Sequence, residues 1–247
     1  MKSKRTFAVF GAGVLLFCLR LTQNRLGFEP ETGLALQNLW TMLPFAAAGL
    51  LAAGCFLTAQ KRETRCFADA FAQPDGLPLA LLVTGGCLLM AGGGCLCVSA
   101  VGNGLFLREQ IPLLLSAGLG VLSGAGVLVL VWEWRRAEKI TVAPLLPLLF
   151  LLPILLLWVY LETATDPILA RVALPVLAAA AGSLATAQLA GFFYGEKDSR
   201  WFAATACLGA ALGLAVLGDA WLPVGFRVML GGIALLLLSF HALLRRE

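Results

Sequence analysis

Long apolar segments alternate with short polar ones along the whole chain. Eight segments of 16 to 24 residues with almost no charge lie at 6–21, 39–57, 77–100, 111–132, 142–160, 168–189, 201–217 and 223–244. About 20 apolar residues of helix cross the hydrocarbon core of a bilayer. Lipid offers the backbone no hydrogen-bond partner, so helices suit such segments better than the alternating strands of a barrel. The pattern predicts an all-α polytopic membrane helix bundle with eight transmembrane helices in a single domain, 1–247.

Composition agrees with this prediction. Hydrophobic residues fill 60% of the 247 positions and charged residues only 13%, whereas charged residues make up about a quarter of an ordinary soluble domain. The basic segment before the first span is typical of a secretion signal, but no small-x-small cleavage pattern follows it. We therefore expect the first span to be a retained membrane helix.

The distribution of Lys and Arg predicts the orientation. Eight spans place both chain ends on one side, and the segments on that side carry thirteen of the 18 Lys and Arg residues. The other side has Arg20, Arg25, Arg108, Arg171 and Arg227 and no lysine. Because positively charged connections stay in the cytoplasm, we predict a bacterial plasma (inner) membrane protein with both termini cytoplasmic. The net charge of +4 then reflects orientation and anionic lipid, and it does not indicate nucleic acid.

Glycines are frequent within the spans. The third span contains Gly85, Gly86, Gly92, Gly93 and Gly94. Small residues allow the backbones of membrane helices to approach closely, so we interpret these glycines as packing positions. A hinge or a lipid-accessible groove along this span is the alternative.

Two further patterns concern bending and symmetry. Pro153 lies within the fifth span and is expected to bend it, because proline removes an amide donor. The segments at 28–30 and 165–167 each precede an apolar span that ends in Thr-Ala-Gln, at 58–60 and 186–188. This similarity predicts a weak 4+4 parallel repeat, an arrangement that some transporters use.

Several kinds of chemistry have no pattern in this chain. His241 is the only histidine, and the seven cysteines form no C-x-x-C pair, so the sequence indicates neither a haem or zinc site nor a dithiol motif. No G-x-S-x-G serine is present. No Asp or Glu lies near the middle of a span, where proton-coupled carriers usually place one. We expect no enzyme, no cofactor and no metal site, with His241 near the membrane surface.

The outer connections carry the candidate ligand-binding residues. Asp166 and Asp219 precede prolines near the start of the sixth and eighth spans, and Arg171 and Arg227 each follow such a proline by four residues. The simple interpretation is a set of capped helix ends with ion pairs. In the alternative, these four residues and Glu162 line an outer vestibule that binds an anionic or zwitterionic headgroup or solute, because guanidinium groups suit carboxylate and phosphate.

Two other sets are weaker candidates. Thr186 and Gln188 in the sixth span are candidates for lining a neutral site, although hydrogen bonds between helices explain them equally well. Phe67 and Phe71 lie at helical spacing in the longest cytoplasmic connection. They predict a short helix lying on the membrane surface, with docking of a partner as the alternative.

Three short stretches resemble an uncharacterised family of multi-pass bacterial integral membrane proteins with about eight helices. They are GFEPETGL at 27–34, YLETATDPIL at 160–169 and AGFFYG at 190–195. The resemblance implies a multi-pass membrane protein. Because that family has no assigned function, it implies no activity and no functional residues.

Two classes of function fit these observations. The first is a transporter or permease-like protein for a small neutral, zwitterionic or lipid-like solute, which eight spans with almost no soluble part favour. The second is a non-catalytic membrane sensor, regulator or subunit with a membrane-protein partner or a second copy of the chain, which the lack of mid-span charge favours. A water-accessible cavity reaching the midplane would indicate the first class, and a solid bundle with an exposed face of small residues would indicate the second.

Overall fold

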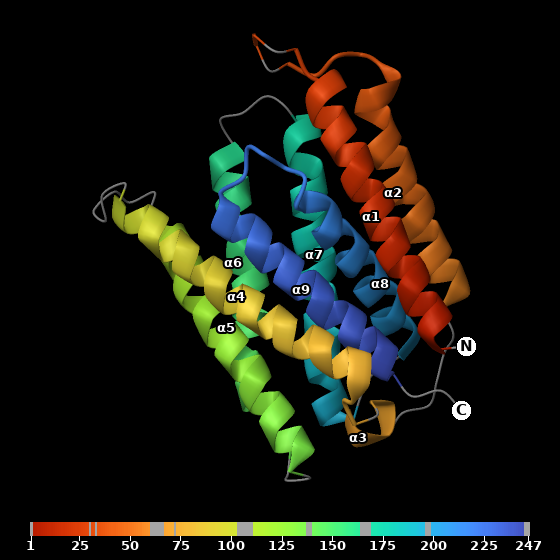
Figure 1. Cartoon of the computed structure of the whole chain (residues 1–247), viewed down its shortest axis with the longest axis vertical. Coiled ribbons are helices and arrows are strands. Elements are labelled where there is room, and N and C mark those ends of the chain that lie inside the picture. Colours follow the sequence, from red (N-terminus) through yellow and green to blue (C-terminus); the bar gives the residue numbers. More distant parts are fainter. Residues whose placement is uncertain are drawn as a thin grey trace.

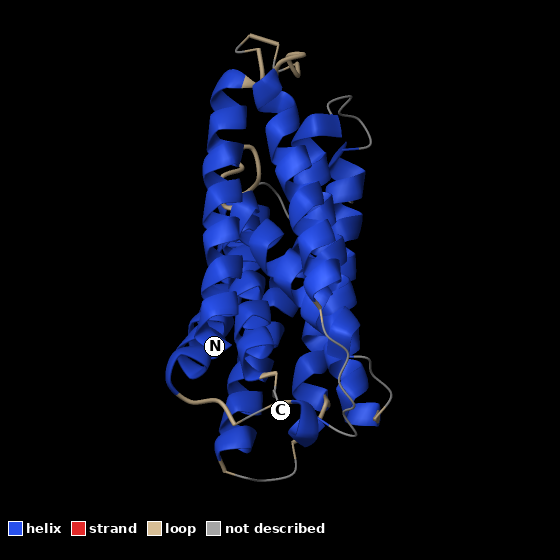
Figure 2. Ribbon diagram, turned by 90° about the vertical axis from the view of Figure 1, so that its right-hand side faces the viewer, coloured by secondary structure: helices blue, strands red, loops and turns tan. Residues whose placement is uncertain are grey.

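The computed structural model describes residues 2–29, 31–32, 34–59, 67–71, 73–102, 111–136, 140–163, 169–195 and 199–244. Within these ranges the chain is predominantly helical, and β structure is limited to two isolated bridges, Phe28–Ala35 and Phe71–Leu244. Figures 1 and 2 show an elongated bundle whose long helices run between its two ends. The predicted all-α fold is confirmed.

The described chain contains eight long helices and one short helix, α3. They are α1 (Lys2–Leu26), α2 (Leu39–Thr58), α3 (Phe67–Ala70), α4 (Gly76–Gly102), α5 (Ile111–Arg135), α6 (Leu146–Thr163), α7 (Leu169–Gly191), α8 (Ser199–Val216) and α9 (Val224–Leu243), with 3-10 turns at Ala143–Leu145 and Phe192–Tyr194. Seven are long and apolar enough to cross a membrane, and a shorter apolar helix covers Ala143–Val159. A multi-pass membrane protein is thus confirmed, whereas the predicted fifth span, 142–160, and the 4+4 repeat stay predictions.

Six of the long helices form a closed ring. α4 packs against α5, α5 against α6, α6 against α7, α7 against α8, α8 against α9, and α9 returns to α4. α1 and α2 form a hairpin outside this ring, where both pack against α8. Figure 1 shows the hairpin on one side of the bundle and the α4–α5 pair on the other.

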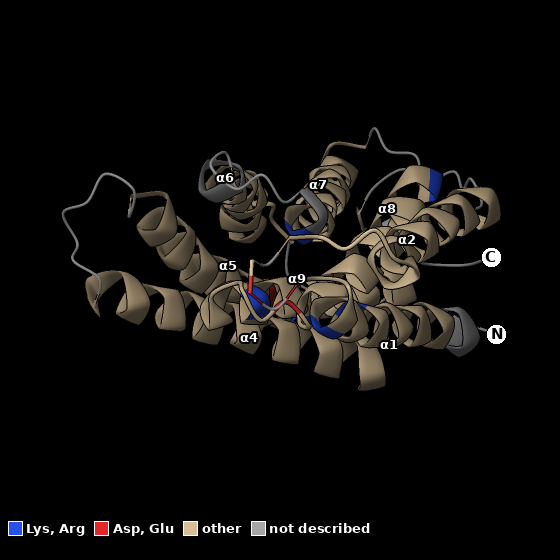
Figure 3. Cartoon of the chain, turned by 90° about the horizontal axis from the view of Figure 1, so that it is seen from above, with Lys and Arg blue, Asp and Glu red and all other residues tan. Residues whose placement is uncertain are grey.

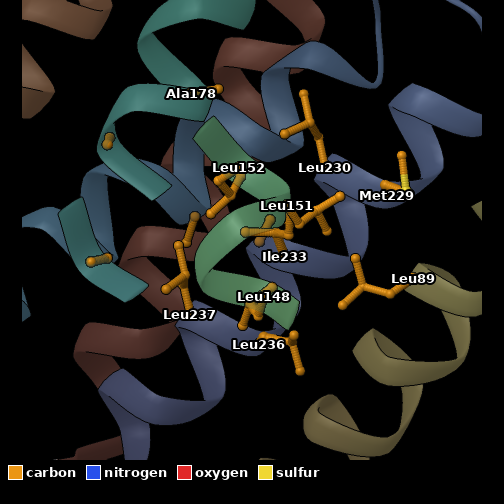
Figure 4. Close-up of a cluster of buried hydrophobic side chains, with 14 of the residues drawn as sticks. Leu89, Leu148, Leu151, Leu152, Ala178, Met229, Leu230, Ile233, Leu236 and Leu237 are labelled. Atoms are coloured by element: carbon orange, nitrogen blue, oxygen red, sulfur yellow. The ribbon is translucent and has the colours of Figure 1, made fainter. Parts of the chain in front are cut away.

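Apolar side chains fill the middle of the ring. Leu148, Leu151 and Leu152 of α6 lie in one buried cluster with Ile233 of α9 and Leu89 of α4 (Figure 4). All five side chains are buried. Interiors of this kind are usually closely packed, and the described middle of the ring is lined by buried apolar side chains.

Glycines hold α4 against α9 at two points seven residues apart. A Cβ added to Gly85 would lie 2.8 Å from the carbonyl oxygen of Gly232, and a Cβ added to Gly92 would lie 2.7 Å from that of Gly225. Seven residues make about two helical turns, so both glycines lie on one face of α4. The two backbones are in direct contact there, as the packing interpretation predicted.

The glycines that follow these two in the sequence, Gly86 and Gly93, face α5 instead. Gly86 meets Gly124, and a Cβ on Gly93 would lie 2.6 Å from the carbonyl oxygen of Ala117. The packing interpretation is therefore confirmed for both faces of α4. Gly94 differs, because a Cβ added there would meet no atom within 4 Å.

The two ends of the bundle are named here by one residue each. The Asp219 end contains the end of α1, the start of α2 and the connection from α8 to α9, and the His241 end contains the end of α2, the start of α8 and the end of α9. Figure 1 places the start of α1 and the end of α9 at the same end. The structure contains no membrane, so the side on which each end lies remains a prediction.

An aromatic cluster closes the His241 end. It consists of Phe67, Phe71, Trp134, Phe192, Phe193, Phe202 and Phe240, whose rings contact one another at centroid distances of 4.4–6.5 Å. Phe67 and Phe71 are 4% and 1% exposed. The expected membrane-surface helix is therefore wrong for these two side chains, because they bury their rings among the helix ends rather than in lipid.

Candidate functional site at the Asp219 end

A buried arginine organises the polar groups at the Asp219 end. Arg20 lies in α1 and is completely buried. Its Nε donates a hydrogen bond to Oδ1 of Asp219, and the two side chains form an ion pair. Its other two nitrogens donate to Oε1 of Gln23 and to the backbone oxygen of Arg171, each at 2.5 Å. One side chain therefore joins α1, α7 and the α8–α9 connection; Figure 3 shows acidic and basic residues gathered there.

Proline explains why the backbone oxygen of Arg171 is available. In an α-helix this oxygen would accept from the amide four residues later, but that residue is Pro175, which lies inside α7 and has no N–H. A carbonyl left without its helical donor needs another one when it is buried. Arg20 supplies that donor.

Asp219 lies in a tight connection rather than in a helix. Its amide donates to the backbone oxygen of Val216 at 2.9 Å, and its own backbone oxygen accepts from Leu222 at 3.3 Å. The side chain is completely buried. Burial raises the pKa of the Asp219 carboxyl, and the Arg20 guanidinium beside it opposes this rise.

Two residues near Arg20 in α1 form further hydrogen bonds at this end, one to α2 and one to the segment after α8. Gln23, also completely buried, donates from Nε2 to the backbone oxygen of Thr41 in the first turn of α2, at 2.8 Å. Asn24 donates from Nδ2 to the backbone oxygen of Gly218, just after α8, at 2.8 Å. We call Arg20, Gln23, Asn24, Thr41 and Asp219 the polar cluster.

The structure describes the surroundings of only some of the predicted vestibule residues. Asp219 and the backbone of Arg171 meet through Arg20, while the Arg171 guanidinium lies 5.2 Å from the centre of the Phe28 ring. Glu162 belongs to α6, but its side chain lies outside the described residues, as does Asp166. The vestibule itself stays a prediction.

Arg227 lies in the first turn of α9 with a buried Nε. Among the described residues, this atom has no hydrogen-bond partner, and the same is true of Asp219 Oδ2 and Trp221 Nε1. Buried polar groups usually have a partner. Asn24 and Trp221 nevertheless favour the ionised Asp219 carboxyl and oppose the rise of its pKa. Of the three atoms, only Nε of Arg227 is therefore left as a candidate contact for a polar ligand or water.

The two span-six candidates take part in bonds within and between helices. The hydroxyl of Thr186 donates to backbone oxygens one turn earlier, Gly182 at 3.0 Å and Ser183 at 3.1 Å. Oε1 of Gln188 in α7 accepts from the hydroxyl of Thr205 in α8 at 3.1 Å. This geometry fits the helix-packing interpretation, and their role in lining a neutral site stays a prediction.

Sequence reasoning placed Arg20 among the cations of the outer side, as one of several possible partners for the outer acids. The predicted first span ended at Leu21, where the apolar run stops, whereas α1 continues to Leu26 through Gln23 and Asn24. Arg20 therefore lies inside the helix and not at its edge. The usable signal was Pro175, because a proline in a helix identifies in advance a carbonyl that needs a donor from elsewhere.

The hydrogen bonds of the polar cluster hold helices together at the Asp219 end. Each nitrogen of Arg20 already donates to a protein group. In the part of the chain that the structure describes, no group of three or more His, Cys, Asp or Glu side chains is arranged to hold a metal ion.

Comparisons with known proteins add no family. No protein-family model matches the chain, and neither a curated protein nor a solved structure is significantly similar to it. The resemblance of the three short stretches is therefore not supported by an identified family.

Proposed function

We propose that this protein is a non-catalytic membrane component, namely a sensor, a regulator or a subunit of a membrane complex. The observation that carries the proposal is the closed six-helix ring with its apolar interior, where Leu89, Leu151 and Ile233 are at most 3% exposed. A carrier would have to separate these side chains to open a water-filled path, and the described spans provide no charged group in the middle to help water enter.

We propose further that α6, the shorter apolar helix, also spans the membrane. We also propose that the His241 end faces the cytoplasm of a bacterial cell. The excess of Lys and Arg in the segments assigned to that end supports this orientation. Reporter domains inserted after position 165 and fused after position 247 test it. They should report opposite sides, and a result with both on one side would contradict the proposal.

Water access to the middle of the ring tests the function. In a variant whose native cysteines are replaced by alanine or serine, Leu151→Cys and Ile233→Cys would be exposed in intact membranes to a water-soluble, membrane-impermeant maleimide. We expect no labelling of either position, but labelling of Ala220→Cys, whose side chain is exposed at the Asp219 end. Labelling of Leu151→Cys or Ile233→Cys would mean that water reaches the ring interior, and it would favour transport.

A permease-like protein for a zwitterionic or lipid-like solute is the second candidate, favoured by the buried Nε of Arg227, which has no hydrogen-bond partner among the described residues. Thermal unfolding in mild detergent, with and without phosphocholine or inorganic phosphate, tests it. This candidate requires a stabilisation that Arg171→Ala and Arg227→Ala remove and that Arg25→Ala, at an exposed position of α1, retains. An equal response in all variants would exclude these arginines as ligand groups.

A further inference from the structure

Three side chains with reactive groups meet at the His241 end. Cys55 lies in the last turn of α2, Cys207 in α8 and His241 in the last turn of α9. Sγ of Cys207 lies 3.5 Å from both ring nitrogens of His241. Cys55, Cys207 and Ala204 form one small buried cluster. The sequence has no C-x-x-C pair because the two cysteines come from different helices.

Small residues explain why the two thiols are so close. α8 presents Ala204 one turn before Cys207, and Ala203 and Ala206 beside them are also buried. Alanine lets neighbouring membrane helices approach to backbone contact. A disulfide requires its two Cβ atoms to lie about 3.5–4.5 Å apart, which only closely packed helices provide.

These two cysteines also differ from the others in burial. Cys55 and Cys207 are 9% and 8% exposed, whereas the other described cysteines, Cys18, Cys87, Cys95 and Cys97, are exposed on the surface of the bundle. An exposed thiol on a membrane helix faces lipid. A buried pair beside an imidazole has both an acceptor for the first proton and a second sulfur.

We propose that Cys55 and Cys207 form a thiol–disulfide exchange site in which His241 accepts the first proton and an apolar, low-molecular-weight disulfide is the oxidant. The Cys207 thiol passes its proton to His241, and its thiolate attacks one sulfur of the reagent, whose S–S bond breaks. The expelled thiolate takes the proton from His241. The sulfur of Cys55 then attacks Cys207 and expels the second reagent thiolate, which takes the Cys55 proton. One reagent disulfide becomes two thiols, and one S–S bond joins α2 to α8.

The position of the pair gives the new bond a defined effect. α2 belongs to the hairpin outside the ring and α8 belongs to the ring, so the disulfide fastens the hairpin at the His241 end. The polar cluster already fastens it at the Asp219 end. The redox state of the pair therefore determines whether a covalent bond adds to the packing of the hairpin on α8 at the His241 end. This inference does not depend on the function proposed above.

Oxidation of the full-length protein in detergent tests the site. The probe is 4,4′-dithiodipyridine, an apolar aromatic disulfide, and the products are mapped by mass spectrometry of proteolytic peptides. We expect rapid release of two thiopyridone molecules per chain and a peptide pair linked through Cys55 and Cys207. A stable mixed disulfide on Cys207 without the cross-link, or faster reaction at the exposed cysteines, would overturn the proposal. This measurement uses the unaltered chain, so it does not depend on a variant that folds.

Variants then separate the roles. Cys55→Ser should stop the reaction at a mixed disulfide on Cys207 and release one thiopyridone from this site, whereas Cys87→Ser, at an exposed position, should leave the cross-link unchanged. His241→Ala should slow the first release by about 100-fold near neutral pH, as expected for loss of a positioned base, and reaction at high pH should restore the rate. An unchanged rate in His241→Ala at every pH would overturn the assignment of the base.

Discussion

The two ends of the bundle are closed by different forces. At the Asp219 end, Arg20, Gln23 and Asn24 reach backbone oxygens of three other segments by hydrogen bonds. At the His241 end, Phe67 and Phe71 fill the space between helix ends with aromatic contacts. Hydrogen bonds require each partner at a fixed distance and angle, whereas apolar packing tolerates swaps that conserve volume. We infer that the Asp219 end sets the relative positions of the helices and that the His241 end contributes apolar burial.

The largest effect is expected from breaking the ion pair. Asp219→Leu leaves the guanidinium of Arg20 buried without its carboxylate, and removal of one partner of a buried pair costs about 3–5 kcal/mol. We expect the free energy of unfolding to fall by that amount. Titration of the protein with SDS in mixed micelles, followed by circular dichroism, measures it.

A double variant shows whether unpaired charge causes the loss. Arg20→Met combined with Asp219→Leu removes both charges, and apolar replacements of buried pairs are often neutral or stabilising. The double variant should therefore be more stable than Asp219→Leu alone. If it is equally unstable, the hydrogen bonds of Arg20 to Gln23 and Arg171, rather than its charge, hold this end together.

The aromatic end should respond to volume instead. Phe71→Ala removes a ring that is 1% exposed and should lower the free energy of unfolding by about 3 kcal/mol. Phe71→Leu keeps much of the volume and should cost less than about 1.5 kcal/mol. The same SDS titration applies, with Phe10→Ala, at an exposed position of α1, as the control. Equal losses for both Phe71 variants would remove the contrast between the two ends.

The helices were predictable because membrane crossing imposes a simple rule on sequence. Apolar runs long enough to cross lipid are visible without knowledge of any contact, and α2 and α4 begin within one residue of the predicted spans. The start of α6 was less accurate because Pro144 and Pro147 fall at the junction, where a 3-10 turn at Ala143–Leu145 precedes the helix. Proline permits several local geometries at a helix start.

The contacts at the two ends were not predictable in the same way. The pairing of Arg20 with Asp219 joins positions 199 residues apart, and several arginines of the same side were equally plausible partners. Phe67 and Phe71 have the spacing of a surface helix, and their burial depends on the shape of the space between helix ends. The local sequence pattern indicates the periodicity and polarity of a segment. These contacts depend instead on which helices become neighbours in the folded chain.

The middle of the bundle, between the two ends, should show a third behaviour. Gly92→Val forces a branched side chain against the backbone of α9, where a Cβ alone would lie 2.7 Å from the carbonyl oxygen of Gly225. Overpacking of this kind costs about 2 kcal/mol. Gly94→Val, two residues further along the same helix, places its side chain in open space and should leave the SDS midpoint unchanged. A similar loss in both variants would mean that contact with the backbone of α9 is not the cause of the loss.

The smallest effect concerns Thr41, the member of the polar cluster on α2. Its buried hydroxyl lies 2.6 Å from the backbone oxygen of Leu36 and 3.0 Å from that of Gly27. Both oxygens also accept backbone amides, from Asn38 and Leu36 respectively. Thr41→Val therefore removes one donor without leaving either acceptor unpaired, and we expect a loss of about 1 kcal/mol. Thr41→Ser should retain most of the stability, and Thr58→Val, at an exposed position of the same helix, should change nothing. A loss as large as that of Asp219→Leu would show that this hydroxyl, rather than the ion pair, orders the Asp219 end.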